Sequence, residues 1–306
     1  MTASVAQGFQ GPFLIGLAVN IFLHGLATTQ VYLYLTMYKK DRLWLKSFVV
    51  ILYLLDTFNC VVSIYYIYNA LIINFGDEAN LVRGNWAFAA GAASTGVVSV
   101  AVQHFFAWRA HVVTKNVFIV AAIVLCSLAN LAGSLATTVG LALDPSIFLV
   151  PDLRIEVSMW LVGAVIADAI IAVSLVWHLG RHKSFYPALN STINRILRMT
   201  VQTGVVTTIV AIVDLTCYMT NSMGNYVLFS QILSKLYTNC MLSTLNARTP
   251  HKYDGSSEDE VSHGRSNHPG VVVFQPQRTQ PEVFVQVETH PLADMDDKPS
   301  QGMQYF

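Results

Sequence analysis

The chain has 306 residues, of which 54% are hydrophobic and only 12% are charged. A soluble domain carries about twice that charged fraction, so the composition excludes an ordinary soluble protein and indicates a membrane protein. The formal net charge is zero and is uninformative alone, because the charges are unevenly distributed along the chain. We expect no nucleic-acid partner.

The first segment, residues 1–11, contains no Lys or Arg and lacks the basic start of a signal peptide. Seven apolar stretches follow, and about 20 apolar residues are enough to cross a bilayer as a helix. We predict spanning helices at 12–36, 47–72, 86–109, 117–142, 156–179, 200–221 and 227–247. The predicted fold is therefore an all-α, seven-helix transmembrane bundle that occupies residues 12–248 as one domain. Small residues such as Gly96 and Gly133 suit close contact between its helices.

Basic residues are concentrated in every second loop. One set of segments carries Lys39, Lys40, Arg42, Lys46, Arg109, Lys115, Arg181, Lys183, Arg195, Arg198, Arg248 and Lys252. The alternate segments carry only Arg83 and Arg154. Because cytoplasmic loops are enriched in Lys and Arg, this asymmetry predicts an extracytoplasmic N-terminus and a cytosolic C-terminus. The sequence does not distinguish the plasma membrane from an internal membrane.

The composition changes after the seventh stretch. Residues 249–306 are rich in Pro, Ser, Gln and acidic residues, a composition that buries too little apolar surface to fold alone. We expect a disordered cytosolic tail. Its short β-prone runs, Val271–Phe274 and Val283–Val287, could dock on a cytosolic protein partner, and Ser256–Glu260 resembles an acidic-directed kinase site.

Polar side chains inside the apolar stretches are the candidate functional positions, because each mid-bilayer charge costs about 2.5–3.5 kcal/mol. They are Asp56, Asp168, Asp214 and Lys235, with His24 and His104 as secondary candidates that taken singly are more typical of packing. At about 1.5 Å per residue, Asp214, Lys235 and Asp168 lie roughly 10, 14 and 18 Å below the outer face. We therefore expect Lys235 to pair with Asp214 or Asp168, and Asp56, nearer the cytosol, to lie outside this cluster.

The seventh stretch has a polar stripe. Gln231, Lys235, Asn239 and Ser243 follow each other at i, i+4 spacing, so they share one helix face. That face must point into the bundle or a wet cavity. It predicts either a ligand or ion site in the outer half of the bundle, or an interhelical hydrogen-bond network that only fixes packing.

Several sequence motifs carry a family resemblance. They are GPFLIG (11–16), LLDTFN (54–59), QHFFAWR (103–109), ADAIIAVSLVW (167–177), INRILRMTVQTG (193–204) and SKLYTNCMLSTLNAR (234–248). Residues 11–248 thereby resemble a mushroom-fungal family of seven-pass membrane proteins that is catalogued only as a domain of unknown function, number sixty-five thirty-four. The resemblance implies a membrane location and this fold, and it supplies no catalytic residue.

Two functions remain open. A receptor-like or sensory protein would bind a small ligand among the helices, although no Asp/Glu-Arg-Tyr motif ends the third helix and the seventh has no proline. A transporter or ion pathway would use the intramembrane Asp and Lys residues, although no internal repeat or broken helix pair is evident. Membrane lipids are the expected partners in either case.

Other classes have less support. A retinal protein would use Lys235 as the Schiff base, but Gln231 stands where microbial rhodopsins carry a carboxylate, and the third helix has no acidic residue. The sequence contains no phosphate-binding Gly-rich loop, HExxH motif or nucleophile elbow. We predict no catalytic residues, no metal site and no cofactor.

Overall fold

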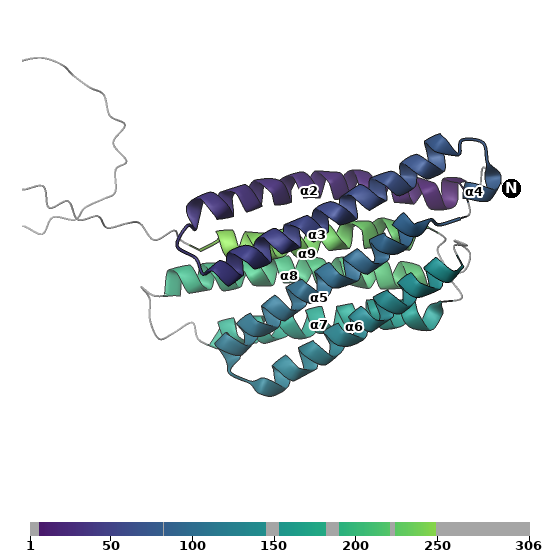
Figure 1. Ribbon diagram of the computed structural model, residues 1–306. Coiled ribbons are helices and arrows are strands. Elements are labelled where there is room, and N and C mark those ends of the chain that lie inside the picture. Colours follow the sequence, from purple (N-terminus) through teal and green to yellow (C-terminus); the bar gives the residue numbers. More distant parts are fainter. Residues whose placement is uncertain (1–5, 82, 145–152, 182–189, 221–223, 249–306) are drawn as a thin grey trace, which may run out of the picture. The chain divides into compact units, whose positions relative to one another are not determined.

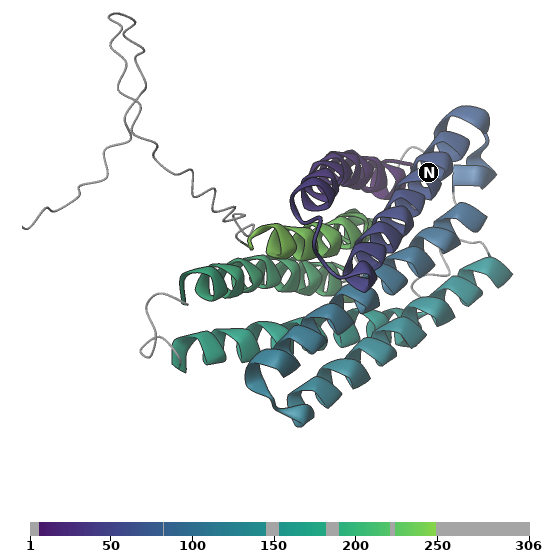
Figure 2. The ribbon, with the colours of Figure 1, turned by 60° about the vertical axis from the view of Figure 1, so that its left-hand side comes forward.

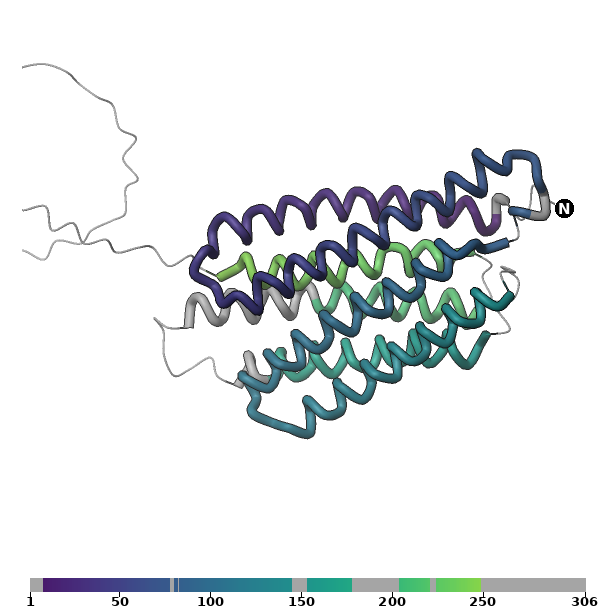
Figure 3. The backbone as a smooth tube through the Cα atoms, in the orientation of Figure 1, coloured from purple at the N-terminus to yellow at the C-terminus, as the bar shows by residue number. Residues whose placement is uncertain are grey.

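The structure, a computed structural model, describes the backbone of residues 6–81, 83–144, 153–181, 190–220 and 224–248 (Figure 1, Figure 3). Side chains at 6–7, 78–79 and 178–203 are not described. The predictions for the tail, including its disorder, its β-prone runs and the kinase site, therefore lie outside the described residues.

Seven long helices make up the described chain. They are α2 (Gly11–Met37), α3 (Leu43–Tyr68), α5 (Trp86–Thr114), α6 (Val117–Leu143), α7 (Arg154–Arg181), α8 (Asn190–Met219) and α9 (Asn225–Asn246). Short π-helical segments, η1 (Ala6–Gln10) and η2 (Asn69–Ile73), adjoin α2 and α3, and a single turn, α4 (Glu78–Leu81), precedes α5. No β-strand element occurs among these described ranges. The all-α prediction is confirmed.

Helices α5 and α8 extend well beyond the ranges that the apolar pattern predicted. Helix α5 continues to Thr114, and α8 begins at Asn190 instead of residue 200. The prediction ended each helix at the boundary between apolar and polar residues, but polarity alone does not end a helix. Helix α5 ends where Lys115 adopts the left-handed conformation, with φ of 53°, which is a usual helix-ending geometry.

The helices form a bundle in which α5 is central. Helices that follow each other in the chain pack side by side, and α2 also packs along α9, so the last helix returns to the first. Helix α5 contacts α3, α6, α7 and α9 (Figure 2). The central position of α5 brings residues from both halves of the chain to the same interior.

The bundle is apolar on its outer faces, and its interior holds many polar side chains beside apolar ones. Large apolar side chains such as Ile15, Phe22 and Leu125 are exposed on the outer faces, whereas Asp56, Asp214 and many other polar side chains are buried. A soluble protein has the reverse pattern. In the described part of the chain, five helical segments are long and apolar enough to cross a membrane: Gly8–Met37, Leu43–Ile73, Trp86–Thr114, Val117–Leu143 and Arg154–Trp177. These observations show a multi-pass membrane protein.

Within their described residues, helices α8 and α9 are not as long and apolar as these five segments. Among the described side chains of α8, the apolar part runs from Gly204 to Met219. Helix α9 carries many polar residues, but it packs against α2, α3, α5 and α8. Its polar side chains are therefore covered by other helices instead of lipid. For such an interior helix, a low mean hydropathy is compatible with a position inside the membrane.

Aromatic pairs occur on the outside near both ends of the bundle. Trp44 and Trp108 meet edge to face with ring centroids 5.4 Å apart, and Tyr65 and Trp86 meet at 5.3 Å. All four side chains are exposed. Trp and Tyr concentrate at the two membrane–water interfaces, so the pairs are placed as interface anchors would be.

Helices α6 and α7 approach each other most closely at glycine. A Cβ added to Gly133 would lie 2.5 Å from the backbone nitrogen of Trp160 and 2.6 Å from the carbonyl oxygen of Glu156. On the facing helix, a Cβ at Gly163 would lie 2.9 Å from the backbone of α6 at Cys126 and Asn130. Close contact through small residues, as expected for Gly133, is thus present here.

Candidate functional site

A buried ion pair joins α3 and α9 at the middle of the bundle. The Nζ of Lys235 lies 2.9 Å from Oδ1 of Asp56, and neither side chain is exposed. Lys235 also donates to the backbone oxygen of Asp56. Ser234 donates to the same carboxylate oxygen at 3.1 Å. Two charges in low dielectric are tolerated only when they are paired and hydrogen-bonded, and these contacts meet both conditions.

The expected pairing of Lys235 with Asp214 or Asp168 is therefore wrong. The expected depths were counted in residues from the outer end of each helix, on the assumption that these ends lie at one level. The helix ends do not lie at one level. Tyr66 of α3 packs in the same apolar cluster as Val227 of α9, while α3 and η2 continue to Ile73. From that shared level, Asp56 and Lys235 lie about 15 Å and about 12 Å deep at 1.5 Å per residue. They meet because α3, continued by η2, extends beyond the level at which α9 begins.

Asn59 connects this ion pair to the central helix. Its Oδ1 accepts from Lys235 at 3.4 Å, and its Nδ2 donates to Ser94 at 2.8 Å and Thr95 at 3.1 Å on α5. Asn20 of α2 donates to Asn59 at 3.5 Å. The charged pair is thus one part of a hydrogen-bond network that joins α2, α3, α5 and α9.

His24 of α2 borders the same carboxylate. Its Nδ1 lies 3.5 Å from Oδ2 of Asp56, its Nε2 lies 3.4 Å from the Thr57 hydroxyl, and its ring stacks on Tyr53 at 5.4 Å. Its side chain is 17% exposed. His104, the other histidine candidate, instead contacts the carbonyl oxygen of Val100 at 2.8 Å, away from the ion pair.

Asp168 belongs to a second network. One carboxylate oxygen accepts from Gln103 of α5 at 3.0 Å, and the other accepts from the Tyr237 hydroxyl of α9 at 2.7 Å. Gln103 in turn accepts from Asn130 of α6 at 3.2 Å. This network joins α5, α6, α7 and α9, and no ion pair with a described residue completes it.

Asp214 of α8 lies in a third position. Ser230 of α9 donates to its Oδ2 at 2.8 Å, and the aspartate is fully buried. Its Oδ1 has no hydrogen-bond partner among the described residues. The three sequence-predicted aspartates are thus separated, each bonded to a different part of α9.

The polar stripe of α9 faces α2 and α3. Gln231 accepts from Ser63 of α3 at 3.1 Å through its side chain. Asn239 donates to the carbonyl oxygen of Leu23 on α2 at 3.0 Å. The stripe therefore points into the bundle, as predicted.

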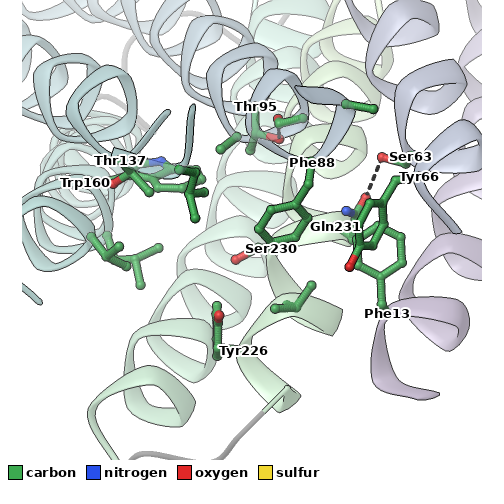
Figure 4. A pocket seen from close by; sticks show the side chains of 17 residues that line it. Phe13, Ser63, Tyr66, Phe88, Thr95, Thr137, Trp160, Tyr226, Ser230 and Gln231 are labelled. Atoms are coloured by element: carbon green, nitrogen blue, oxygen red, sulfur yellow. Dashed lines mark hydrogen bonds between the residues drawn. The ribbon is translucent and has the colours of Figure 1, made fainter. Parts of the chain in front are cut away.

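A pocket opens among the ends of six helices, next to the N-terminus of α2. Figure 4 shows aromatic rings on its walls and the Ser63–Gln231 hydrogen bond at one side. It is lined by Phe13, Ser63, Tyr66, Ala87, Phe88, Gly91, Ala92, Thr95, Thr137, Leu141, Val157, Trp160, Leu161, Tyr226, Val227, Ser230 and Gln231. The centres of water molecules can occupy about 60 Å³ of it. Adding the radius of a water on every side gives a volume on the order of 200 Å³.

The pocket connects to the buried networks. Thr95 in its wall accepts from Asn59, which contacts Lys235. Ser230 in its wall donates to Asp214. Mostly apolar and aromatic walls with a few convergent polar groups are the usual composition of a small-molecule site.

A further ion pair lies at the opposite end of the bundle, between Arg248 and Asp41. Arg248 lies 2.6 Å from Asp41, and its guanidinium lies 4.7 Å from the centre of the Tyr38 ring. Asp41 also accepts from Tyr34 at 2.9 Å. These contacts join the α2–α3 loop to the end of α9.

Sequence reasoning missed the neutral members of the networks. Asn20, Asn59, Gln103 and Asn130 are all buried, and they lie inside the predicted apolar stretches. The argument that identified the charges, the cost of polar groups in lipid, applies to amides as well and would have identified them. Nothing in the sequence indicated Ser230, since serine is common in membrane helices.

No curated protein and no solved structure matches the chain. A family model does match, and it is described as a family of unknown function, DUF6534. The match covers residues 164–250, which include most of α7 and all of α8 and α9, and therefore Asp168, Asp214 and Lys235. Over this segment the chain is thus similar to that family of unknown function, the one that its motifs resemble.

Proposed function

We propose that this protein is a receptor-like membrane protein that binds a small organic molecule in the pocket beside the N-terminus of α2. The observation that carries the proposal is the pocket itself, with its aromatic walls and convergent hydroxyl and amide groups. Its size, on the order of 200 Å³ by the argument above, suits a molecule with one ring or a short chain.

The lining decides what kind of molecule fits. Its 17 residues include rings, small aliphatic side chains, hydroxyls and one amide, and no charged side chain. An anion such as a phosphate or carboxylate would find no cationic partner there. The expected ligand combines an apolar body with one or two hydrogen-bonding groups.

A ligand bound in the pocket would be connected to the middle of the bundle by hydrogen bonds. Thr95 and Asn59 connect the pocket wall to Lys235, and Lys235 holds α3 to α9. Helix α9 continues from the pocket to Arg248 at the opposite end. A ligand that favours one arrangement of α9 over another would shift the population of that arrangement, which is the property that a receptor needs.

The charge asymmetry supports a matching orientation. The basic segments lie at the end opposite the pocket, so the positive-inside rule directs the pocket away from the cytosol. In this orientation an external molecule reaches the pocket without crossing the membrane, and Arg248 and the tail face the cytosol.

An ion or proton pathway is the second candidate. It is favoured by the adjacent His24, Asp56 and Lys235, because intramembrane charges often form proton relays. Purified protein in liposomes would distinguish the two functions. A pathway predicts that an imposed pH gradient collapses faster than in empty liposomes and that Asp56→Asn abolishes the difference, whereas a receptor predicts no effect on the gradient.

The receptor proposal is tested by thermal unfolding of detergent-purified protein against a library of small neutral and cationic molecules. A ligand that binds only the folded state raises the melting temperature. Gly91 lines the pocket, and a Cβ there would meet no atom within 4 Å, so Gly91→Leu should fill the pocket and abolish the shift.

The matched control is Gly25→Leu, the same substitution at an exposed position of α2 where a Cβ also meets nothing within 4 Å. It should retain the ligand-induced shift. Shifts that persist equally in both variants would place binding elsewhere and contradict the proposal.

A further inference from the structure

Asp214 is a buried carboxylate directly behind the pocket wall. It has no exposed surface, and its Oδ2 accepts from Ser230 at 2.8 Å. Ser230 is itself a lining residue of the pocket. One hydroxyl group therefore separates the empty space from the carboxylate.

The carboxylate is incompletely satisfied within the described chain. Its Oδ1 has no hydrogen-bond partner there, and no described Lys, Arg or His forms an ion pair with it. Asp56 differs, since Lys235 balances its charge. Leaving a buried charged acceptor unsatisfied is costly, so a positive charge near Asp214 would be favourable.

The geometry lets a ligand in the pocket supply that charge. A donor placed about 3 Å from the Ser230 hydroxyl would lie about 5–6 Å from the carboxylate, a range in which opposite charges attract strongly away from water. The serine would accept from the ligand while donating to Asp214.

The aromatic walls favour the same kind of group. Phe88 and Tyr226 lie near Ser230 in the pocket, and Trp160 lies across it beside Thr137 (Figure 4). The faces of aromatic rings attract cations, and they do so more strongly when water is excluded. The rings thus suit both the apolar body of a ligand and a cationic end.

We propose that the pocket takes a small primary amine, bound as its ammonium ion through Ser230 to Asp214, with its apolar body among the aromatic rings. This inference rests on the proposed ligand-binding function and specifies the chemical class of the ligand.

The test compares two probes of nearly the same shape, 2-phenylethylamine and 2-phenylethanol, by calorimetric titration of the full-length protein in detergent. The amine is expected to bind about tenfold or more tightly than the alcohol, since only the amine carries the charge. Asp214→Asn should remove most of that preference and leave the affinity for the alcohol nearly unchanged. Asp144→Asn, which removes an exposed carboxylate at the same end of the bundle, should keep the preference.

Ser230 provides the second pair of variants if Asp214→Asn does not fold. Ser230→Ala should weaken amine binding, and Ser230→Thr, which keeps the hydroxyl, should retain it. Equal affinities for the two probes, or an amine preference that survives both Asp214→Asn and Ser230→Ala, overturn the inference but leave ligand binding standing. If neither probe binds, the inference fails, and the library scan then decides the proposed function separately.

Discussion

Lys235 of α9 and Asp56 of α3 form an ion pair of 2.9 Å between two side chains that have no exposed surface. The residues are far apart in the sequence, so the pair fixes the register between an early helix and the last one. Because a hydrocarbon surrounding cannot solvate either charge, each residue depends on the other. The pair also lies one amide, Asn59, away from the wall of the pocket.

The first prediction concerns this pair. Lys235→Met should strand the Asp56 carboxylate and lower the stability by about 3–5 kcal/mol, the usual cost of breaking a well-buried pair. Adding Asp56→Asn should recover part of the loss, because the stranded charge is then removed. Thermal unfolding of the two single variants and the double variant measures the coupling.

The control for this cycle combines Lys235→Met with Asp168→Asn. Asp168 accepts from Gln103 and Tyr237 instead of Lys235, so the two effects should add. Recovery with Asp168→Asn but not with Asp56→Asn would show that the ion pair described above is wrong.

A second prediction contrasts an exposed pair with the buried one. The side chains of Arg248 and Asp41 are 28% and 19% exposed, so water screens their attraction. Arg248→Gln should therefore cost no more than about 1 kcal/mol, the range for accessible ion pairs, and the loss should shrink in high salt. A loss as large as that of Lys235→Met would mean that Arg248 has a larger structural role than its ion pair explains.

The sequence predicted the seven helices well because helix position in a membrane protein follows from apolar length. The contacts of Lys235 could not be predicted in the same way. Counting residues from each predicted helix end assumes that all helices begin at one level, and α3 with η2 extends to Ile73 beyond the start of α9. Only tertiary packing, such as that of Tyr66 with Val227, reveals this offset.

The residues that line the pocket could likewise not be predicted from the sequence, although a ligand site in the outer half of the bundle was among the predictions. Cavities arise where side chains from several helices fail to fill the space. Phe13, Thr137 and Tyr226 come from three helices widely separated in the sequence. No spacing rule relates them, so only the three-dimensional arrangement shows that they share one wall.

The third prediction concerns the contact between α6 and α7. Gly133→Ala should destabilise the protein by about 1–3 kcal/mol, the usual cost of overpacking, because its Cβ would lie 2.5 Å from the backbone of α7. Gly25→Ala is the matched control on an exposed helix face with open space around the Cβ. Equal melting temperatures for the two variants would contradict the close approach described here.

Orientation gives the fourth prediction. In sealed vesicles whose cytosolic face is outward, protease should remove an epitope placed after Phe306 and spare one placed before Thr2. The reason is the concentration of Lys and Arg in alternate segments, which cells retain on the cytosolic side. The reverse pattern would direct the pocket toward the cytosol and remove the argument for an external ligand.

The central claim is that a small molecule enters the pocket beside α2, and the fluorescence of Trp160 tests it most directly. Trp160 is 8% exposed and lines the pocket, so a variant with the other four tryptophans changed to Phe reports on that position alone. We predict that titration with 2-phenylethylamine or 2-phenylethanol gives a saturable change, lost on adding Gly91→Leu and kept on adding Gly25→Leu. A change that rises linearly without saturation, or one that is identical in both variants, would contradict the account.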